Sequence, residues 1–139
     1  MDGDKRIEHC IGRYIAEHYN SPVEIGVGHN FTAAECIVSA GTRCRCTDIK
    51  PQVPPQGVCF IRDDIFSPDI GQYAGTDVLY SVRPAVEMVP PMMELARSLN
   101  GDLLVYHLGF ESYGDGGDLV DCGVILHRYH RRDTGSEKG

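Results

Sequence analysis

A glycine turn between two predicted strands constrains this chain more than any other stretch. The apolar run 22–25 predicts a strand, and Gly26 and Gly28 follow it directly, before a helix pattern that begins near Asn30. Gly26 can adopt backbone angles closed to other residues, and Gly28 has no Cβ to block a ligand approaching the chain. The unpaired N–H groups at the start of the helix face whatever lies over the turn. The order of strand, turn and helix therefore predicts the beginning of a nucleotide-binding βαβ unit.

An acidic residue follows the turn at a spacing typical of ribose recognition. Asp48 comes 20 residues after Gly28, at the end of the next predicted strand, 43–48. A carboxylate there can accept hydrogen bonds from ribose hydroxyls. The dinucleotide fingerprint would place a third glycine where this chain has Phe31, so the sequence disfavours NAD and a NAD-linked oxidoreductase. Because two glycines are a weak signal, a tight turn that binds no ligand stays open as an alternative.

Glu24 precedes the two glycines and completes an acidic-x-Gly-x-Gly pattern. This pattern is similar to the first motif of S-adenosylmethionine-dependent methyltransferases. In that resemblance the acid after the second strand, here Asp48, holds the ribose. The acid after the third strand, here Asp63 or Asp64 behind the predicted strand 58–62, meets the adenine amino group. The resemblance implies S-adenosylmethionine as the cofactor and the two glycines, Glu24 and these acids as its binding residues.

More chemically active side chains follow the later predicted strands. Open parallel sheets bind ligands beyond the carboxyl ends of their strands. The strand 77–82 carries Ser81 and leads into Arg83, while His107 lies near the end of another strand. Arg83 could fix a carboxylate or phosphate of an acceptor, or it could pair with Glu87. We assign Ser81, Arg83 and Glu87 to the substrate side of the crevice, and we identify no general base.

The remaining pattern predicts an α/β fold with a Rossmann-like, mostly parallel sheet of about six strands. Apolar residues at helical spacing predict a first helix over 4–19. Three prolines exclude a crossover helix from 49–57, so that loop or a second protomer is expected to cover the sheet there, and a homodimer is a further expectation. The apolar run 103–108 suits a central parallel strand, and 119–129 is expected to fold back as an antiparallel edge strand.

Length and composition bound the remaining possibilities. With 139 residues, the chain is expected to form one domain over 1–130 and a disordered tail over 131–139. The net charge of −7 argues against a nucleic-acid partner and leaves a small-molecule nucleotide as the expected one. We find neither a signal peptide nor an apolar run of membrane-spanning length, so we expect a cytoplasmic protein with no membrane association. The six cysteines are expected to be reduced thiols, and their spacing predicts no metal site.

Taken together, these motifs resemble the uncharacterised protein family numbered 0146, small archaeal proteins with a methyltransferase-like Rossmann fold and no established activity. Ala85 stands where the resemblance leads us to expect another proline. The resemblance implies a fold and a site but no reaction. Two functions from different classes stay open: a methyltransferase-like protein that binds S-adenosylmethionine, and a non-catalytic nucleotide-binding or interaction module. The resemblance covers nearly the whole chain and rests on 23–28, 47–49, 63–66 and 80–84, followed by Glu87.

Overall fold

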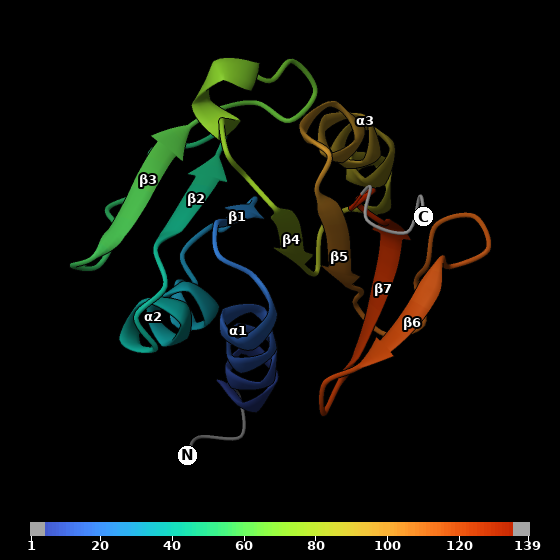
Figure 1. Ribbon diagram of the computed structural model, residues 1–139, viewed down its shortest axis with the longest axis horizontal. Coiled ribbons are helices and arrows are strands. Elements are labelled where there is room, and N and C mark those ends of the chain that lie inside the picture. The colour runs from blue at the N-terminus through green and yellow to red at the C-terminus, as the bar shows by residue number, and fades with distance from the viewer. Residues whose placement is uncertain (1–4, 135–139) are drawn as a thin grey trace.

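The computed structural model describes residues 5–134 and contains a seven-stranded sheet in the order β3-β2-β1-β4-β5-β7-β6 (Figure 1). The five neighbouring strands β3, β2, β1, β4 and β5 run parallel. β7 and β6 continue the sheet as an antiparallel hairpin. The predicted fold class is thereby confirmed. The strand order reverses between β1 and β4, which is where a sheet of this kind opens a crevice. The strands are β1 (Pro22–Ile25), β2 (Cys44–Asp48), β3 (Val58–Arg62), β4 (Val78–Val82), β5 (Asp102–Tyr106), β6 (Asp118–Asp121) and β7 (Ile125–His130).

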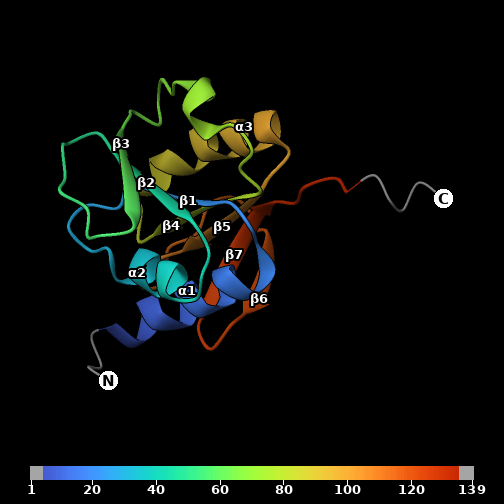
Figure 2. The same ribbon diagram turned by 60° about the vertical axis from the view of Figure 1, so that its left-hand side comes forward.

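Helices cover both faces of the sheet (Figure 2). One face carries α1 (Arg6–His18) and α2 (Thr32–Ser39), and the other carries α3 (Val89–Leu99) and the 3-10 turn η2 (Ile70–Tyr73). Successive side chains of a strand point to opposite faces. In β4, accordingly, Val78 and Tyr80 belong to the core under α1 and α2, while Leu79 belongs to the core under α3.

The third helix begins at the two prolines that interrupt its apolar pattern. Pro90 and Pro91 occupy the first turn of α3, where a missing N–H has no helical partner to lose. A short 3-10 turn, η3 (Val86–Met88), leads into the helix. Asn100 ends it in the left-handed conformation, with φ 53°. Within residues 5–134, none of the helices has the length and apolar character that a membrane crossing requires.

One predicted strand is two strands in the structure. The run 119–129 was expected to form a single edge strand, but a turn divides it into β6 and β7. Gly123 adopts φ 104°, and its N–H donates to the Asp121 carboxylate at 2.9 Å. Glycine alone takes this conformation easily, so the chain reverses here and the expected strand becomes a hairpin.

The proline-rich loop 49–57 contains no helix, as predicted. It lies against α2, since a Cβ built on Gly57 would come within 2.9 Å of Val38 Cγ1. On the opposite face the segment after β3 covers the sheet, because the Arg45 guanidinium donates to the carbonyl oxygens of Gln72 and Ala74. The chain itself therefore supplies cover near β2. The expected homodimer stays a prediction.

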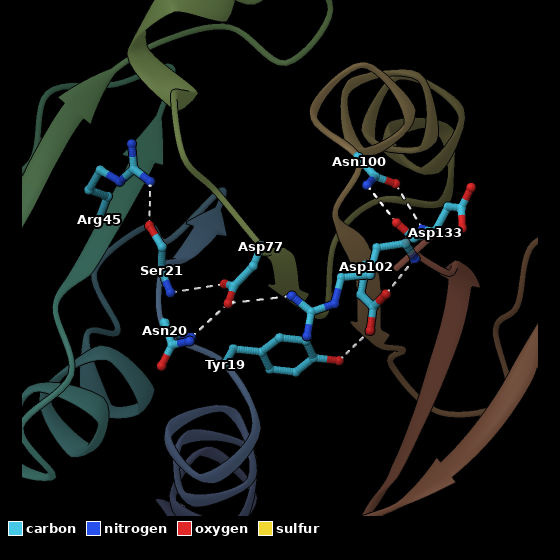
Figure 3. Close-up of polar contacts among 9 residues, drawn as sticks. Tyr19, Asn20, Ser21, Arg45, Asp77, Asn100, Asp102 and Asp133 are labelled. Carbon is cyan, nitrogen blue, oxygen red and sulfur yellow. Dashed lines mark hydrogen bonds and ion pairs between the residues drawn. The ribbon is translucent and has the colours of Figure 1, made fainter. Parts of the chain in front are cut away.

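A polar network closes the amino ends of the central strands (Figure 3). The buried Asp102 carboxylate accepts hydrogen bonds from the Tyr19 hydroxyl at 2.5 Å and from the Arg132 N–H at 2.7 Å. Burial, together with the Asp102 carboxylate, raises the pKa of Tyr19. Asp133 and Asn100 exchange two hydrogen bonds of 2.8 Å. Part of the predicted tail, 131–139, is thus held on the domain, and residues 135–139 of it lie outside the described residues.

Candidate functional site

The carboxyl ends of β1, β2 and β3 surround a cleft of about 210 Å³. Four of the predicted cofactor-binding residues line it together: Gly26, Asp48, Asp63 and Asp64. Apolar side chains complete the wall. They are Ile25, Ile49, Ile65, Phe66 and Met88, of which Ile49 and Phe66 are more than half exposed. The cleft therefore combines hydrogen-bond acceptors with an apolar surface.

Both glycines of the turn adopt the left-handed conformation, which the sequence predicts for Gly26. Their φ angles are 71° for Gly26 and 59° for Gly28. The N–H groups of Gly26 and Val27 donate to the Thr47 carbonyl and fix the turn to β2. A Cβ built on Gly28 would meet no atom within 4 Å, whereas one on Gly26 would lie 3.3 Å from Met88 Cε. The backbone at Gly28 is therefore accessible to a ligand, whereas the flexible side chain of Met88 lies beside Gly26.

Asp48 is tied to the glycine turn. Its Oδ2 accepts a hydrogen bond from the Gly28 N–H at 2.8 Å, and its Oδ1 accepts one from the Lys50 N–H at 3.0 Å. Each carboxylate oxygen can accept a further bond. The side chain is half-buried at the wall of the cleft. The structure thus holds Asp48 in place and leaves it capacity to bind a hydroxyl group.

The two acids after β3 play different parts. Asp63 accepts from the Tyr73 hydroxyl at 2.6 Å and from the Asp69 N–H, so it holds η2 against the sheet. Burial and this carboxylate raise the pKa of Tyr73. Among the residues that the structure describes, Asp64 Oδ1 accepts a hydrogen bond only from the local N–H of Phe66, at 2.9 Å. Of the two alternatives that the sequence left open, Asp64 has the greater capacity to accept a bond from a ligand.

Glu24 does not line the cleft, and its assignment as a cofactor-binding residue stays a prediction. It is 3% exposed, and its Oε1 accepts a hydrogen bond from the Tyr80 hydroxyl at 2.9 Å. Strand alternation directs Glu24 and Tyr80 to the α1 and α2 face, while Ile25 points to the cleft side. Burial raises the pKa of Glu24 well above its ordinary value, although the hydrogen bond from Tyr80 acts to lower that pKa.

The predicted substrate-binding residues are largely engaged elsewhere. The buried Ser81 hydroxyl donates to the Ile25 carbonyl at 2.8 Å, so it links β4 to β1. Arg83 pairs with Glu8 at 2.8 Å and not with Glu87, which is exposed. Arg83 also adopts φ 55°, and its guanidinium lies 5.4 Å from the centre of the Tyr106 ring. Ser81 and Arg83 are thus engaged within the protein, and their role in substrate binding stays a prediction.

Glu8, which the sequence analysis does not single out, is the partner of Arg83. It lies within the apolar pattern of α1 and is almost fully buried. Its Oε2 accepts from Arg83 and from Asn30 Nδ2, at 2.8 and 2.9 Å, while its buried Oε1 has no hydrogen bond among the described residues. Burial raises the pKa of Glu8, but the Arg83 and Asn30 bonds and the guanidinium charge outweigh it, so the pKa is lowered. Glu8 thereby ties α1 to the loop before α2 and to the residue that follows β4.

His107 lies beyond the end of β5, beside a second cavity of about 290 Å³. Its Nε2 makes a hydrogen bond of 2.7 Å with the Tyr129 hydroxyl. His127, which the sequence did not single out, lines the same cavity. A histidine in an edge hairpin carries no spacing signal, so only the pairing of β5 with β7 brings the two together.

The reversed strand order, the glycine turn at the reversal and the acids beyond β2 and β3 define a Rossmann-like α/β protein of the methyltransferase-like class. Solved methyltransferases share this fold. CcbJ from Streptomyces caelestis aligns with a TM-score of 0.61 and 15% identity over 76% of this chain and 52% of that chain. The sugar N-methyltransferase KedS8 from Streptoalloteichus aligns with a TM-score of 0.55 and 15% identity over 82% of this chain and 54% of that chain. The chain thus spans about half the length of CcbJ.

The chain belongs to the uncharacterised protein family UPF0146, whose match spans residues 9–114. A relative from Archaeoglobus fulgidus is 34% identical over 106 residues, 76% of this chain and 78% of the relative. A relative from Pyrococcus horikoshii is 34% identical over 112 residues, 77% of this chain and 86% of the relative. The resemblance seen in the sequence is therefore confirmed.

Proposed function

We propose that the protein binds S-adenosylmethionine, or a related adenosine ligand, in the cleft beyond β1, β2 and β3, and that it is a methyltransferase-like protein. The observation that carries this proposal is the position of Asp48. Its carboxylate is fixed by the Gly28 N–H at 2.8 Å, on the wall of a cleft that also exposes apolar side chains. S-adenosylmethionine supplies an activated methyl group when it is bound.

The residues present suit an adenosine. A ribose offers two hydroxyl donors, and Asp48 is the acceptor beside the open glycine turn. Adenine offers a flat apolar ring with an amino donor, for which the cleft provides Ile49, Phe66 and the Asp64 carboxylate. Met88 lies over the turn and can adapt its side chain to a ligand.

Calorimetry with S-adenosylhomocysteine tests the proposal directly. Asp48→Ala is expected to weaken binding by about 1–3 kcal/mol, because the ribose loses its acceptor. The matched control is Asp121→Ala, which removes a carboxylate that makes the same kind of bond to a glycine N–H, at 2.9 Å, far from the cleft in β6. Binding by the control should equal that of the wild type. No heat from the wild-type protein at millimolar ligand would overturn the proposal.

A non-catalytic nucleotide-binding module is the second candidate. The observation that favours it is the chemistry of the cleft, whose lining residues include carboxylates but no histidine, lysine or arginine. Incubation with methyl-labelled S-adenosylmethionine and cell extract separates the two functions. Transfer of label to an extract component supports the methyltransferase, whereas binding without transfer supports the module.

A further inference from the structure

A second cavity lies on the same edge of the sheet as the cleft. We call it the edge pocket; it is lined by Tyr106, His107, Gly109, Val124, Ile125 and His127 and has a volume of about 290 Å³. Because β7 runs antiparallel to β5, the first residues of β7 lie beside the carboxyl end of β5. Neighbouring strands are about 4.8 Å apart, so β5 lies roughly 10 Å from β1, with β4 between them. The edge pocket and the cleft therefore flank the end of β4.

A hydrogen bond to the backbone determines which ring nitrogen of His127 carries the proton, and the other nitrogen is an acceptor. Its Nδ1 lies 2.8 Å from the Gly116 carbonyl oxygen. A carbonyl can only accept, so Nδ1 carries the proton and Nε2 of the neutral ring has a free lone pair. Nε2 makes no hydrogen bond among residues 5–134. Gly116 permits this approach, since it adopts φ 86° and a Cβ there would crowd His127 Nδ1 at 3.4 Å.

His107 forms the inner wall of the edge pocket. It is 5% exposed, and its ring centre lies 4.9 Å from that of His127. The Tyr129 hydroxyl bonds to His107 Nε2 and accepts the Tyr113 N–H at 2.8 Å, which fixes the ring. Burial lowers the pKa of His107, and the nearby His127 adds to this effect. His107 is therefore a neutral aromatic wall at physiological pH.

The charges around the edge pocket select the kind of ligand. None of its lining residues is a carboxylate, so an ammonium group would find no counter-charge in the wall. The Arg83 guanidinium lies 5.4 Å from the centre of the Tyr106 ring, but its charge is paired with Glu8. Three aromatic rings line a volume at the small end of ligand pockets. Together with the acceptor Nε2 of His127, these features fit a small aromatic compound with a hydroxyl group.

We propose that the edge pocket binds a small phenolic compound, whose hydroxyl group donates a hydrogen bond to His127 Nε2, and that this compound is the methyl acceptor. This role rests on the proposed function. In the proposed transfer, the phenol O–H bond breaks and its proton passes to His127 Nε2. Bound S-adenosylmethionine would supply the methyl group: the oxygen would form a bond to the methyl carbon as the methyl–sulfur bond broke, with its electron pair staying on sulfur. The imidazolium then returns its proton to solvent.

An NMR titration tests the proposal. The protein is isotope-labelled at histidine and saturated with S-adenosylhomocysteine, phenol is added, and the histidine ring resonances are followed. Anisole, which has no hydroxyl donor, is the matched probe. The His127 resonance is expected to shift with phenol, and phenol should bind about tenfold more tightly than anisole. His127→Asn keeps an N–H for the Gly116 carbonyl but lacks Nε2, so it should abolish this preference.

His130→Asn is the control, since His130 Nδ1 makes the same 2.8 Å bond to the Gly101 carbonyl outside the edge pocket. It should leave the preference for phenol unchanged. Equal binding of phenol and anisole, or no shift of His127 while S-adenosylhomocysteine still binds, would overturn this proposal and leave the proposed function intact. A shift of His127 in a protein that does not bind S-adenosylhomocysteine would remove the acceptor role together with the proposed function.

Discussion

Glu24 shows how a single buried carboxyl group can make stability depend on pH. Burial raises its folded-state pKa well above 4.5. As pH rises above 4.5, the unfolded chain releases the proton first, so the folded state holds more protons. Stability then falls with rising pH until the folded-state pKa is passed. The Tyr80 hydroxyl, 2.9 Å away, offsets part of the burial effect.

Glu24→Gln is therefore expected to gain stability relative to the wild type as pH rises from 5 to 8. Glutamine keeps an acceptor oxygen for the Tyr80 hydroxyl but cannot ionise. Urea denaturation at several pH values measures the difference in free energy of unfolding. Tyr80→Phe serves as the contrast: it leaves Glu24 without a donor and should destabilise the fold by about 1–3 kcal/mol. Parallel pH profiles of the wild type and Glu24→Gln would contradict the assignment.

The ion pair of Arg83 with Glu8 acts at the scale of elements, since it joins α1 to the end of β4. The Glu8 side chain is 3% exposed and that of Arg83 is 31% exposed. The pKa of Glu8 is lowered, so its stabilising effect is present above pH 4.5 and is lost as pH falls through the folded-state pKa. The unusual φ of Arg83 is held by a backbone hydrogen bond from its N–H to the Tyr106 carbonyl.

Arg83→Gln is expected to destabilise the fold by about 1–3 kcal/mol at pH 7, because it leaves a buried charge with less compensation. The loss should shrink at low pH, where Glu8 is protonated. Arg97→Gln breaks an exposed pair with Glu94 and should change stability by less than about 0.5 kcal/mol. Chemical denaturation of both variants at pH 7 and pH 3 checks this. An equal loss at the two pH values would show that the charge of Glu8 is not involved.

The segment after β7 also acts at this scale, because it returns to the amino ends of the central strands. Truncation after His130 removes the Arg132 N–H that donates to the buried Asp102 carboxylate at 2.7 Å. It also removes both hydrogen bonds between Asp133 and Asn100. We expect a loss of about 1–3 kcal/mol in thermal or urea unfolding. Truncation after Thr134 keeps these bonds, so a similar loss in both forms would contradict the prediction.

For the whole molecule, ligand binding is expected to appear as increased thermal stability. A ligand that binds only the folded state stabilises it by about 2.7 kcal/mol at 100 times its Kd. For a domain of this size that raises the Tm by roughly 10 °C. Differential scanning calorimetry with S-adenosylhomocysteine and with NAD checks this, and only the former should raise the Tm. An increase in Tm with NAD alone would instead favour a NAD-linked oxidoreductase, the function that the sequence disfavours.

Much of the fold could be predicted because its signals are local. The apolar spacing of α1, the prolines of 49–57 and the glycine turn each restrict their own backbone. The division of 119–129 into two strands was missed, although Gly123 marks it, because a lone glycine in a strand pattern also fits a bulge. Asp48 was correctly placed beside the turn, since its spacing from Gly28 follows from one helix and one strand.

The sequence by itself determined the order of the elements as far as β5, the unusual backbone at Gly26, and the family. Only the tertiary structure decided which side chains face the cleft. It buried Glu24 in the core, paired Arg83 with Glu8 near the other end of the chain, and placed His107 beside His127 by pairing β5 with β7. The physical reason is that backbone conformation depends on neighbouring residues, whereas the partner of a side chain depends on strand order and on which face it occupies.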